Sequence, residues 1–302
     1  MASLTLRQAV NTRADAAYPR NVTSTLDVDD PAACAARIRE VLGDGPVAVL
    51  TGAGVSTDSG IPDYRGPDSP PRTPMTYQQF TGDAAFRRHY WARNHVGWHH
   101  VHRTLPNDGH RALADLERAG VVDGVITQNV DTLHGAAGSR RVIDLHGRYD
   151  RVACLSCPER ITRARLHERL TLLNPDFTGG VADVEVAPDA DAVLASTEGF
   201  RVADCESCGG VLKPDIVYFG ENVPKARVLE AYRLVEDADA LLVAGSSLTV
   251  LSGRRFVKRA AEMGKPVVIV NRGATRADDL AALTVDAGCT QVLRALAEAY
   301  TR

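Results

Sequence analysis

The stretch VAVLTGAGVS, residues 47–56, decides the fold. It opens with β-branched and apolar residues at 47–51 and runs directly into a Gly-x-Gly turn at 52–54. Strands that are apolar on both faces are typical of parallel sheets covered by helices on each side. A glycine turn after such a strand lets the backbone approach a diphosphate, whose charge is favoured by free N–H groups and a following helix. The stretch therefore predicts the first strand and the ligand-binding turn of an α/β protein.

Similar apolar runs recur along the chain and predict further strands at residues 121–127, 142–145, 216–219, 240–245 and 267–271. Amphipathic stretches predict helices at residues 32–42, 110–119, 226–237 and 252–263. Strands that alternate with helices in this way imply a doubly wound parallel sheet with a Rossmann-like topology. The predicted fold class is α/β.

One segment interrupts the alternation. Residues 148–210 show no strong strand pattern and contain two Cys-x-x-Cys pairs, so we expect a small metal-binding lobe inserted into the sheet. Residues 31–147 and 211–302 then form the Rossmann-like lobe of one catalytic domain spanning 31–302. Residues 1–30 are expected to be an N-terminal arm.

The composition is that of a globular protein without a strong charge bias. The 302 residues are 44% hydrophobic and 24% charged, which excludes a mainly disordered chain. A formal net charge of -3 gives no reason to expect attraction to nucleic acid or to an anionic membrane. The start of the chain lacks the compact apolar core of a secretory signal. We therefore expect a cytoplasmic protein without nucleic-acid or membrane partners, and the sequence leaves its oligomeric state open.

The two cysteine pairs point to a metal ion. They are Cys154 with Cys157 and Cys205 with Cys208, separated by 47 intervening residues. Four thiolates suit tetrahedral zinc with no open position, which is a structural site. A redox pair is the competing interpretation, but a redox Cys-x-x-Cys usually occurs alone at the start of a helix.

The segment after the glycine turn favours a ligand-binding loop. Residues 59–67, SGIPDYRGP, combine turn formers with Asp63, Tyr64 and Arg65. That mixture is unsuited to a core helix and suits a loop that closes over a ligand. The usual dehydrogenase fingerprint would have a third glycine at Thr57.

Several blocks, in order, resemble the sirtuin family over residues 46–289, which is most of the chain. They are GAGVSTDSGIPDYR (52–65), TQNVDTLH (127–134), LHG (145–147), the two cysteine pairs, KPDIVYFGE (213–221), GSS (245–247) and NRG (271–273). TYQQF and YWARNHVGW look most like the class II branch.

The resemblance implies an NAD-dependent protein-lysine deacetylase or deacylase. Such an enzyme transfers the acyl group from a protein lysine to ADP-ribose and releases nicotinamide. Its expected co-substrate is NAD, its expected metal is one structural zinc ion, and its expected partners are the acylated lysines of proteins. A protein ADP-ribosyltransferase using the same pocket is the alternative, and an ordinary dehydrogenase or a zinc-ribbon binding module is less favoured.

The resemblance also implies roles for individual residues. His146, after a predicted strand, is the expected general base for a ribose hydroxyl, since an imidazole titrates near neutral pH. Asn129 is the second expected catalytic residue and, with Gln128, contacts the nicotinamide ribose. Asp63 is assigned to the nicotinamide amide, and Asp131, the third expected catalytic residue, lines the same pocket. The remaining predicted NAD contacts are Gly52, Ala53, Gly54, Ser56, Tyr64, Arg65, Gly245, Ser246, Ser247, Asn271, Arg272, Gly273 and Cys289.

Two substrate contacts remain open at this point. Residues 219–222 are expected to follow a strand whose edge pairs with the substrate backbone, as in strand addition. Tyr90 and Arg93 stand one helical turn apart, as in sirtuins that bind the carboxylate of acidic acyl groups. The alternative interpretation packs Trp91 inward and leaves the arginines solvated. For Cys289, a small buried apolar role is as plausible as a contact with adenine.

Overall fold

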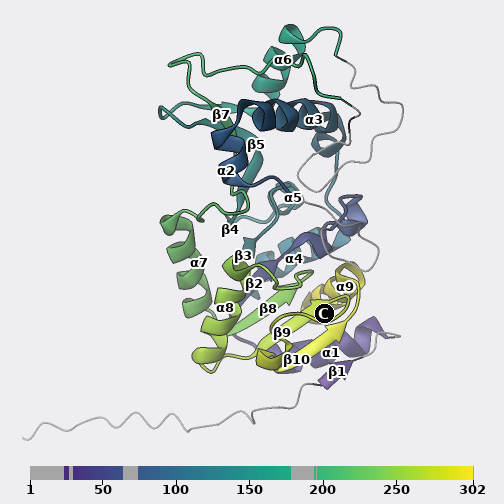
Figure 1. Cartoon of the computed structure of the whole chain (residues 1–302). Coiled ribbons are helices and arrows are strands. Elements are labelled where there is room, and N and C mark those ends of the chain that lie inside the picture. The colour runs from purple at the N-terminus through teal and green to yellow at the C-terminus, as the bar shows by residue number, and fades with distance from the viewer. Residues whose placement is uncertain (1–23, 27–29, 64–73, 178–193, 195, 302) are drawn as a thin grey trace, which may run out of the picture.

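The computed structural model describes residues 24–26, 30–63, 74–177, 194 and 196–301, which form two lobes (Figure 1). The large lobe, lower in the figure, is built on seven strands: β1 (Ser24–Leu26), β2 (Val47–Thr51), β3 (Val122–Thr127), β4 (Val142–Asp144), β8 (Ala240–Ala244), β9 (Val267–Asn271) and β10 (Leu283–Asp286). Their spatial order is β1-β10-β9-β8-β2-β3-β4, and every neighbouring pair is parallel. Apart from the short edge strand β1, this is the six-stranded Rossmann order, whose ligand crevice lies where β2 meets β8.

Helices cover both faces of this sheet. Helices α1 (Pro31–Leu42), α4 (Asp108–Arg118) and α9 (Cys289–Thr301) share one core with Val47 and Val49 of β2. Helices α7 (Lys225–Asp237) and α8 (Leu251–Glu262) share a second core with Ala48 and Leu50. Since alternate residues of one strand enter opposite cores, β2 is buried along its whole length. The predicted doubly wound α/β fold is confirmed.

Local signals fix the ends of several helices. The side chain of Asp30 accepts hydrogen bonds from the N–H groups of Ala32 and Ala33 at the start of α1, and Pro31 occupies the first helical position. Gly43, with a φ of 75°, ends the helix. At the start of α4, Asn107 and His110 form a reciprocal capping pair, which holds His110 beneath the glycine turn.

The small lobe has a three-stranded antiparallel sheet in the order β6-β5-β7. Its elements are β5 (Gly147–Cys154), β6 (Arg160–Thr162), β7 (Leu212–Ile216), α2 (Tyr77–Gly82), α3 (Ala84–His102) and α6 (Arg163–Leu173). One apolar core joins the sheet to the helices, and it includes Phe80 of α2, Trp91 of α3 and Leu166 of α6. The lobe predicted at residues 148–210 therefore shares its core with elements that lie outside that range.

One strand prediction is wrong and two strands escaped prediction. The strand expected at residues 216–219 lies earlier, at Leu212–Ile216, and belongs to the small antiparallel sheet. Residues 148–210, which show no strong strand pattern in the sequence, contain most of β5 and all of β6. These strands bury only part of their surface, and charged residues such as Arg148 and Asp150 interrupt β5, so they carry no continuous apolar run.

The ends of the described chain add two observations. Ser24–Leu26, within the predicted N-terminal arm, forms β1 and pairs in parallel with Leu283–Val285. No helix among the described residues is long and apolar enough to cross a membrane.

Candidate active site

The turns after β2 and β8 pack against each other backbone to backbone. Gly52 donates its N–H to the Ala244 carbonyl at 3.1 Å, and Gly54 donates to the Gly245 carbonyl at 2.9 Å. A Cβ on Gly54 would lie 2.9 Å from the Gly245 Cα, and one on Gly245 would lie 2.6 Å from the Gly54 carbonyl carbon. Gly245 also has a φ of 65°, a conformation that favours glycine. Glycines are required here because two strand ends meet without room for side chains.

This packing corrects one sequence expectation. The segment after the turn is not an α-helix but two short 3₁₀ turns, η1 (Ala53–Val55) and η2 (Thr57–Ser59). The N–H groups of Gly52 and Gly54 are engaged by carbonyls, and the contact of this turn with a diphosphate stays a prediction. No helix dipole adds to the turn, since neither η1 nor η2 exceeds one turn.

A buried polar cluster lies directly beneath the turn. Ser56 Oγ donates to Asp131 Oδ2 at 2.7 Å, and Asn129 Nδ2 donates to Ser56 Oγ at 3.0 Å and to the Gly52 carbonyl at 3.1 Å. The Leu133 N–H donates to the other Asp131 oxygen at 2.9 Å. Burial raises the pKa of Asp131, although these hydrogen bonds act in the opposite direction. Asn129 and Asp131 thus face the same side, as their spacing predicts.

Two histidines connect this cluster to the core. His110 Nε2 lies 3.4 Å from Ser56 Oγ, and His134 Nε2 lies 2.9 Å from Thr51 Oγ1. Burial, reinforced by the charge of Arg111, lowers the pKa of His110 to about 4. The pKa of His134 is also held well below its usual value by burial. Both imidazoles are therefore neutral supports for the glycine turn at pH 7.

A cavity of about 490 Å³ is lined by this cluster and by residues of both lobes. It is lined by residues 216–223 and 246–252 and by Ser56, Asn129 and Asp131 of the cluster. Ser246 Oγ donates to Gln128 Oε1 at 2.7 Å, which ties the end of β8 to the segment after β3. The cavity therefore lies where the strand order places a ligand crevice.

His146 follows β4 and enters the same cavity. Its Nδ1 lies 3.0 Å from the Gln128 carbonyl oxygen, and its Nε2 lies 2.7 Å from Ser252 Oγ. Burial is the main cause that lowers the pKa of His146, and Arg227 and Arg255 act in the same direction. A neutral imidazole in a cavity lined by amides and hydroxyls is equipped to accept a proton.

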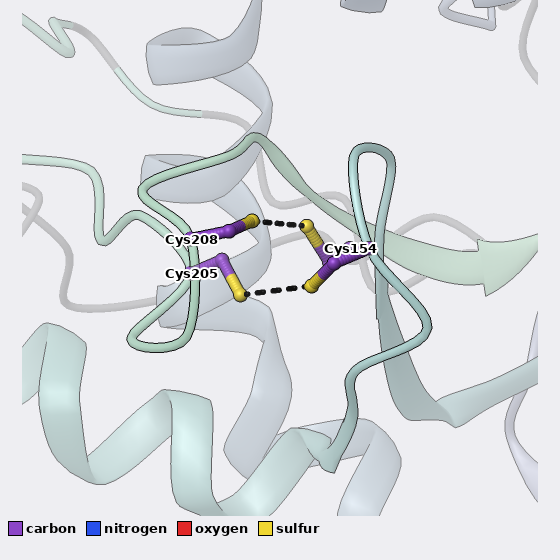
Figure 2. Close-up of side chains that lie close together, drawn as sticks. Cys154, Cys205 and Cys208 are labelled. Atoms are coloured by element: carbon purple, nitrogen blue, oxygen red, sulfur yellow. Dashed lines mark hydrogen bonds between the residues drawn. The ribbon is translucent and has the colours of Figure 1, made fainter.

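The four predicted cysteine ligands come together in the small lobe, and Figure 2 labels three of them, Cys154, Cys205 and Cys208. Cys154 and Cys208 sulfurs are 3.5 Å apart, those of Cys157 and Cys205 are 3.7 Å apart, and all four sulfurs lie within 4.8 Å of one another. Tetrahedral zinc with Zn–S bonds of about 2.3 Å requires sulfurs separated by about 3.8 Å. All four cysteines are free thiols, so the donor set fits a structural zinc ion.

Comparison with known proteins gives the family. A model described as the Sir2 family matches residues 52–252, which contain the glycine turn, His146 and all four cysteines. The chain belongs to the Sir2 family. "NAD-dependent protein deacetylase 1" of Mycobacterium avium (strain 104) is 64% identical over 261 residues, 85% of this chain and 93% of the relative. The protein of the same name from Streptomyces coelicolor is 54% identical over 252 residues, 83% of this chain and 84% of the relative.

Solved Sir2 structures share the fold. A complex described as "Sir2-p53 peptide-NAD+" aligns with a TM-score of 0.71 and 31% identity, covering 87% of this chain and 97% of that one. A structure described as "Structural Basis for the Mechanism and Regulation of Sir2 Enzymes" aligns with a TM-score of 0.69 and 30% identity, covering 89% and 98%. The two-lobed architecture of this sirtuin is thus that of its family.

Some predicted NAD contacts of this sirtuin lie outside the cavity. Asn271, Arg272 and Gly273 follow β9, and the Asn271 side chain donates to the carbonyls of the other two at 2.9 and 3.0 Å. The Cys289 thiol is buried against the Val270 carbonyl at 3.6 Å, and burial raises its pKa to about 12. These positions fit a core role for Cys289, and the contact with adenine stays a prediction.

The loop expected to close over NAD is only partly described. Asp63 ends the described segment and is not among the described residues that line the cavity. Tyr64 and Arg65 lie outside the described residues. The roles assigned to these three residues therefore stay predictions.

The Tyr90 and Arg93 pair does not face the cavity. Tyr90 is 2% exposed and packs edge-on to Tyr218, while Arg93 lies 3.1 Å from His89 Nε2. Trp91 is buried beside Tyr90. Neither Tyr90 nor Arg93 is among the described residues that line the cavity, so the geometry favours a packing role over a carboxylate clamp.

Sequence reasoning missed two side chains that shape the site. Ser252 and Arg255, in the first turns of α8, line the cavity beside His146. The available signal was their place in the helix that follows the Ser246–Ser247 turn, because such helix starts border the crevice of a doubly wound sheet. Lys213 was quoted only as part of a motif, yet this buried lysine forms an ion pair with the half-buried Glu221 at 3.1 Å.

Proposed function

We propose that the chain is an NAD-dependent protein-lysine deacetylase, which transfers the acyl group of a modified lysine to ADP-ribose and releases nicotinamide. Curated relatives at 64% and 54% identity carry the name NAD-dependent protein deacetylase. A Sir2 complex with a p53 peptide and NAD⁺ has the same fold. The single observation that carries the proposal is the convergence of His146 with the Ser56–Asn129–Asp131 cluster in one cavity.

The cavity offers groups for each part of the reaction. Gln128 and Asn129 supply amide groups for the hydroxyls of the nicotinamide ribose, and Asp131 lines the buried end of the same pocket. The hydroxyls of Ser246 and Ser247 border the cavity at the end of β8, where a phosphate or ribose fits. His146 is the base for a ribose hydroxyl, because its lowered pKa keeps it neutral at pH 7.

The acylated lysine enters between residues 216–223 and 246–252. Lys213 Nζ donates to the Ile216 carbonyl and pairs with Glu221, whose carboxylate also accepts the Tyr218 N–H at 2.9 Å. These contacts hold residues 216–221 in shape for main-chain pairing with an extended peptide. Apolar groups such as Val217 and Phe219 then line the path of the lysine methylenes.

Zinc is proposed as a structural ion. Cys154 and Cys205 belong to the small-lobe core, so the ion would join β5, the loop after it and the loop before β7. The Ser156 N–H donates to the Cys154 sulfur and is the main cause that lowers the pKa of that thiol, with smaller contributions from Cys208 and Cys157. The pKa values of Cys157 and Cys208 are raised in the same cluster. The thiolate is the form that binds metal. The site would have no open position, so it would take no part in acyl transfer.

The domain organisation and location are proposed on the sequence. An N-terminal arm ends near residue 30, and one catalytic domain spans residues 31–302, its small lobe completed by α2, α3 and β7. Membership of the class II branch and a cytoplasmic location stay predictions. The packing of Tyr90 supports acetyl or other uncharged acyl groups over acidic ones.

The test is nicotinamide release from NAD, measured with and without a panel of acyl-lysine peptides. Release that requires an acyl peptide, yields acyl-ADP-ribose and is lost in His146→Ala supports the proposal. His102→Ala, which removes an exposed histidine of α3, is the matched control and should release nicotinamide normally. Release without acyl peptide, with labelled ADP-ribose arriving on protein, would instead establish the ADP-ribosyltransferase. No release from folded, zinc-loaded protein would refute both.

A further inference from the structure

Both ring nitrogens of His146 are engaged, and the partners fix its tautomer. Nδ1 lies 3.0 Å from the Gln128 carbonyl oxygen, which can only accept a hydrogen bond, so Nδ1 carries the proton of the neutral imidazole. Nε2 is therefore unprotonated and accepts a hydrogen bond from the Ser252 hydroxyl at 2.7 Å. The basic lone pair of His146 is thus directed at Ser252.

Ser252 is held in that position by the start of α8. It occupies the first turn of the helix, and its neighbour Gly253 allows the helix to approach Gln128, since a Cβ at Gly253 would lie 2.6 Å from Gln128 Nε2. Gln128 is itself fixed by the Ser246 hydroxyl at 2.7 Å. Ser252 and His146 both line the cavity, so the Ser252 hydroxyl contacts the base and also borders the space for the substrate.

We propose that Ser252 relays the proton from the ribose hydroxyl to His146. The ribose hydroxyl donates its proton to Ser252 Oγ while the Ser252 O–H bond breaks and that proton passes to His146 Nε2. The acyl oxygen has by then displaced nicotinamide from the ribose, so the acyl carbon is joined to the lysine nitrogen by a cationic C=N bond. The electron pair left on the ribose oxygen forms a bond to that carbon while the C=N π bond breaks and its electrons go to the lysine nitrogen. The positive charge thereby passes from the lysine nitrogen to the imidazolium. A serine hydroxyl can do this because it has one donor and two acceptor sites. The proposal rests on the proposed function, which supplies the ribose hydroxyl and the acyl group.

A relay fits this geometry better than direct contact. Imidazole has a single lone pair at Nε2, so a ribose hydroxyl could donate to it directly only by displacing Ser252. In the relay, the 2.7 Å contact is kept and the Gln128 carbonyl faces the imidazolium as it forms. Burial and the charges of Arg227 on α7 and Arg255 on α8 disfavour protonation beforehand, which keeps the lone pair available.

The test separates two partial reactions in Ser252→Ala and Ser252→Thr. Exchange of labelled nicotinamide into NAD, with acyl peptide present, needs only cleavage of the nicotinamide bond. Formation of acyl-ADP-ribose in a single turnover also needs the base. We expect Ser252→Ala to keep exchange within about threefold and to lose about 100-fold in acyl-ADP-ribose formation, while Ser252→Thr recovers most of that loss.

The pH profile gives a second readout that a purely structural role would not change. The Ser252 hydroxyl donates to Nε2 of the neutral ring but accepts a stronger, charge-assisted hydrogen bond from Nε2–H of the imidazolium, so its removal should lower the apparent pKa of His146. The acid limb of acyl-ADP-ribose formation should therefore move to lower pH in Ser252→Ala, by about half to one unit.

Two results would overturn the relay. Acyl transfer in Ser252→Ala that equals or exceeds the wild type would show that Ser252 only caps the base. Equal loss of exchange and acyl transfer in both variants, with an unmoved acid limb, would show a structural role. A wild-type chain that makes no acyl-ADP-ribose from any acyl peptide would refute the proposed function itself, which is a distinct outcome.

Discussion

Gly245→Ala should disrupt the junction of the two turns on which the cavity is built. The added Cβ would overlap the Val55 nitrogen and lie 2.6 Å from the Gly54 carbonyl carbon. Both are backbone atoms and cannot rotate away as a side chain could. A φ of 65° costs an alanine about 1–2 kcal/mol, and overpacking of this kind adds about 2–3 kcal/mol. The expected total loss in the free energy of unfolding is about 4 kcal/mol.

Gly120→Ala is the matched control. Gly120 has a φ of 77°, it is exposed, and no atom lies within 4 Å of the position of its Cβ. It therefore isolates the cost of the backbone conformation, about 1–2 kcal/mol. The difference of about 2–3 kcal/mol between the variants corresponds to about 1 M in the urea midpoint for an m-value of about 3 kcal/mol per M.

The assay is urea unfolding followed by far-UV circular dichroism, together with the KM for NAD at a temperature where Gly245→Ala remains folded. We expect a lower midpoint for Gly245→Ala than for Gly120→Ala and a raised KM for NAD in Gly245→Ala alone. Equal midpoints and equal KM values would refute the close packing of the two turns.

Three further predictions follow from the buried groups. His110 has a pKa of about 4 in the folded chain and of about 6.5 in the unfolded chain. Between these two pH values the unfolded chain binds one proton more than the folded chain, so the free energy of unfolding falls as the pH drops from about 6.5 to about 4. His110 contributes roughly 3 kcal/mol to that fall. Urea titrations at pH 7 and 4.5 should therefore show a smaller fall in the free energy of unfolding for His110→Gln than for the wild type. An equal fall in the two proteins would contradict the lowered pKa of His110. Lys213→Met leaves Glu221 without its cation and should lower the free energy of unfolding by about 2–3 kcal/mol and raise the KM for acyl peptide. Arg111→Met, which breaks an exposed pair with Asp108, should lower the free energy of unfolding by less than about 1 kcal/mol. Similar losses in the two variants would count against a stabilising role of the Lys213–Glu221 ion pair. Chelation of zinc should change tryptophan fluorescence before it reduces the far-UV signal of the large lobe, because the chain's 2 tryptophans, Trp91 and Trp98, both lie in α3 of the small lobe. Metal analysis should find one zinc ion per chain, and a fluorescence spectrum unchanged by a strong chelator would contradict a structural metal.

The parts of the fold predicted correctly are those with a local signal. Val47–Thr51 and Val267–Asn271 match β2 and β9, because a buried parallel strand is apolar along its whole length. Ala226–Asp237 was predicted within one residue of α7, where apolar residues recur at helical spacing. The four cysteines were recognised as one donor set because the two Cys-x-x-Cys pairs have the spacing of zinc ligands.

The strands missed by sequence reasoning have a different physical character. Gly147–Cys154 pairs on both sides in a small antiparallel sheet, and its burial pattern is mixed with charged residues. Gly147 itself is required by a close approach, since a Cβ there would overlap the Asp215 carbonyl oxygen. Such a strand is stabilised by partners that are distant in the chain, and the local hydrophobic pattern of the sequence does not reveal these partners.

The sequence by itself determined the α/β class, the strands β2, β3, β4, β8 and β9 of the large lobe and the four cysteines as one set of candidate metal ligands. Only the tertiary structure decided that Ser56, Asn129 and Asp131 share hydrogen bonds, that Gly52 and Gly54 serve close packing, and that Ser252 faces His146. The reason is that hydrophobic periodicity and ligand spacing act over a few residues. The site instead depends on hydrogen bonds between groups 73 to 106 residues apart, which exist only once the parallel strands bring their carboxyl ends together.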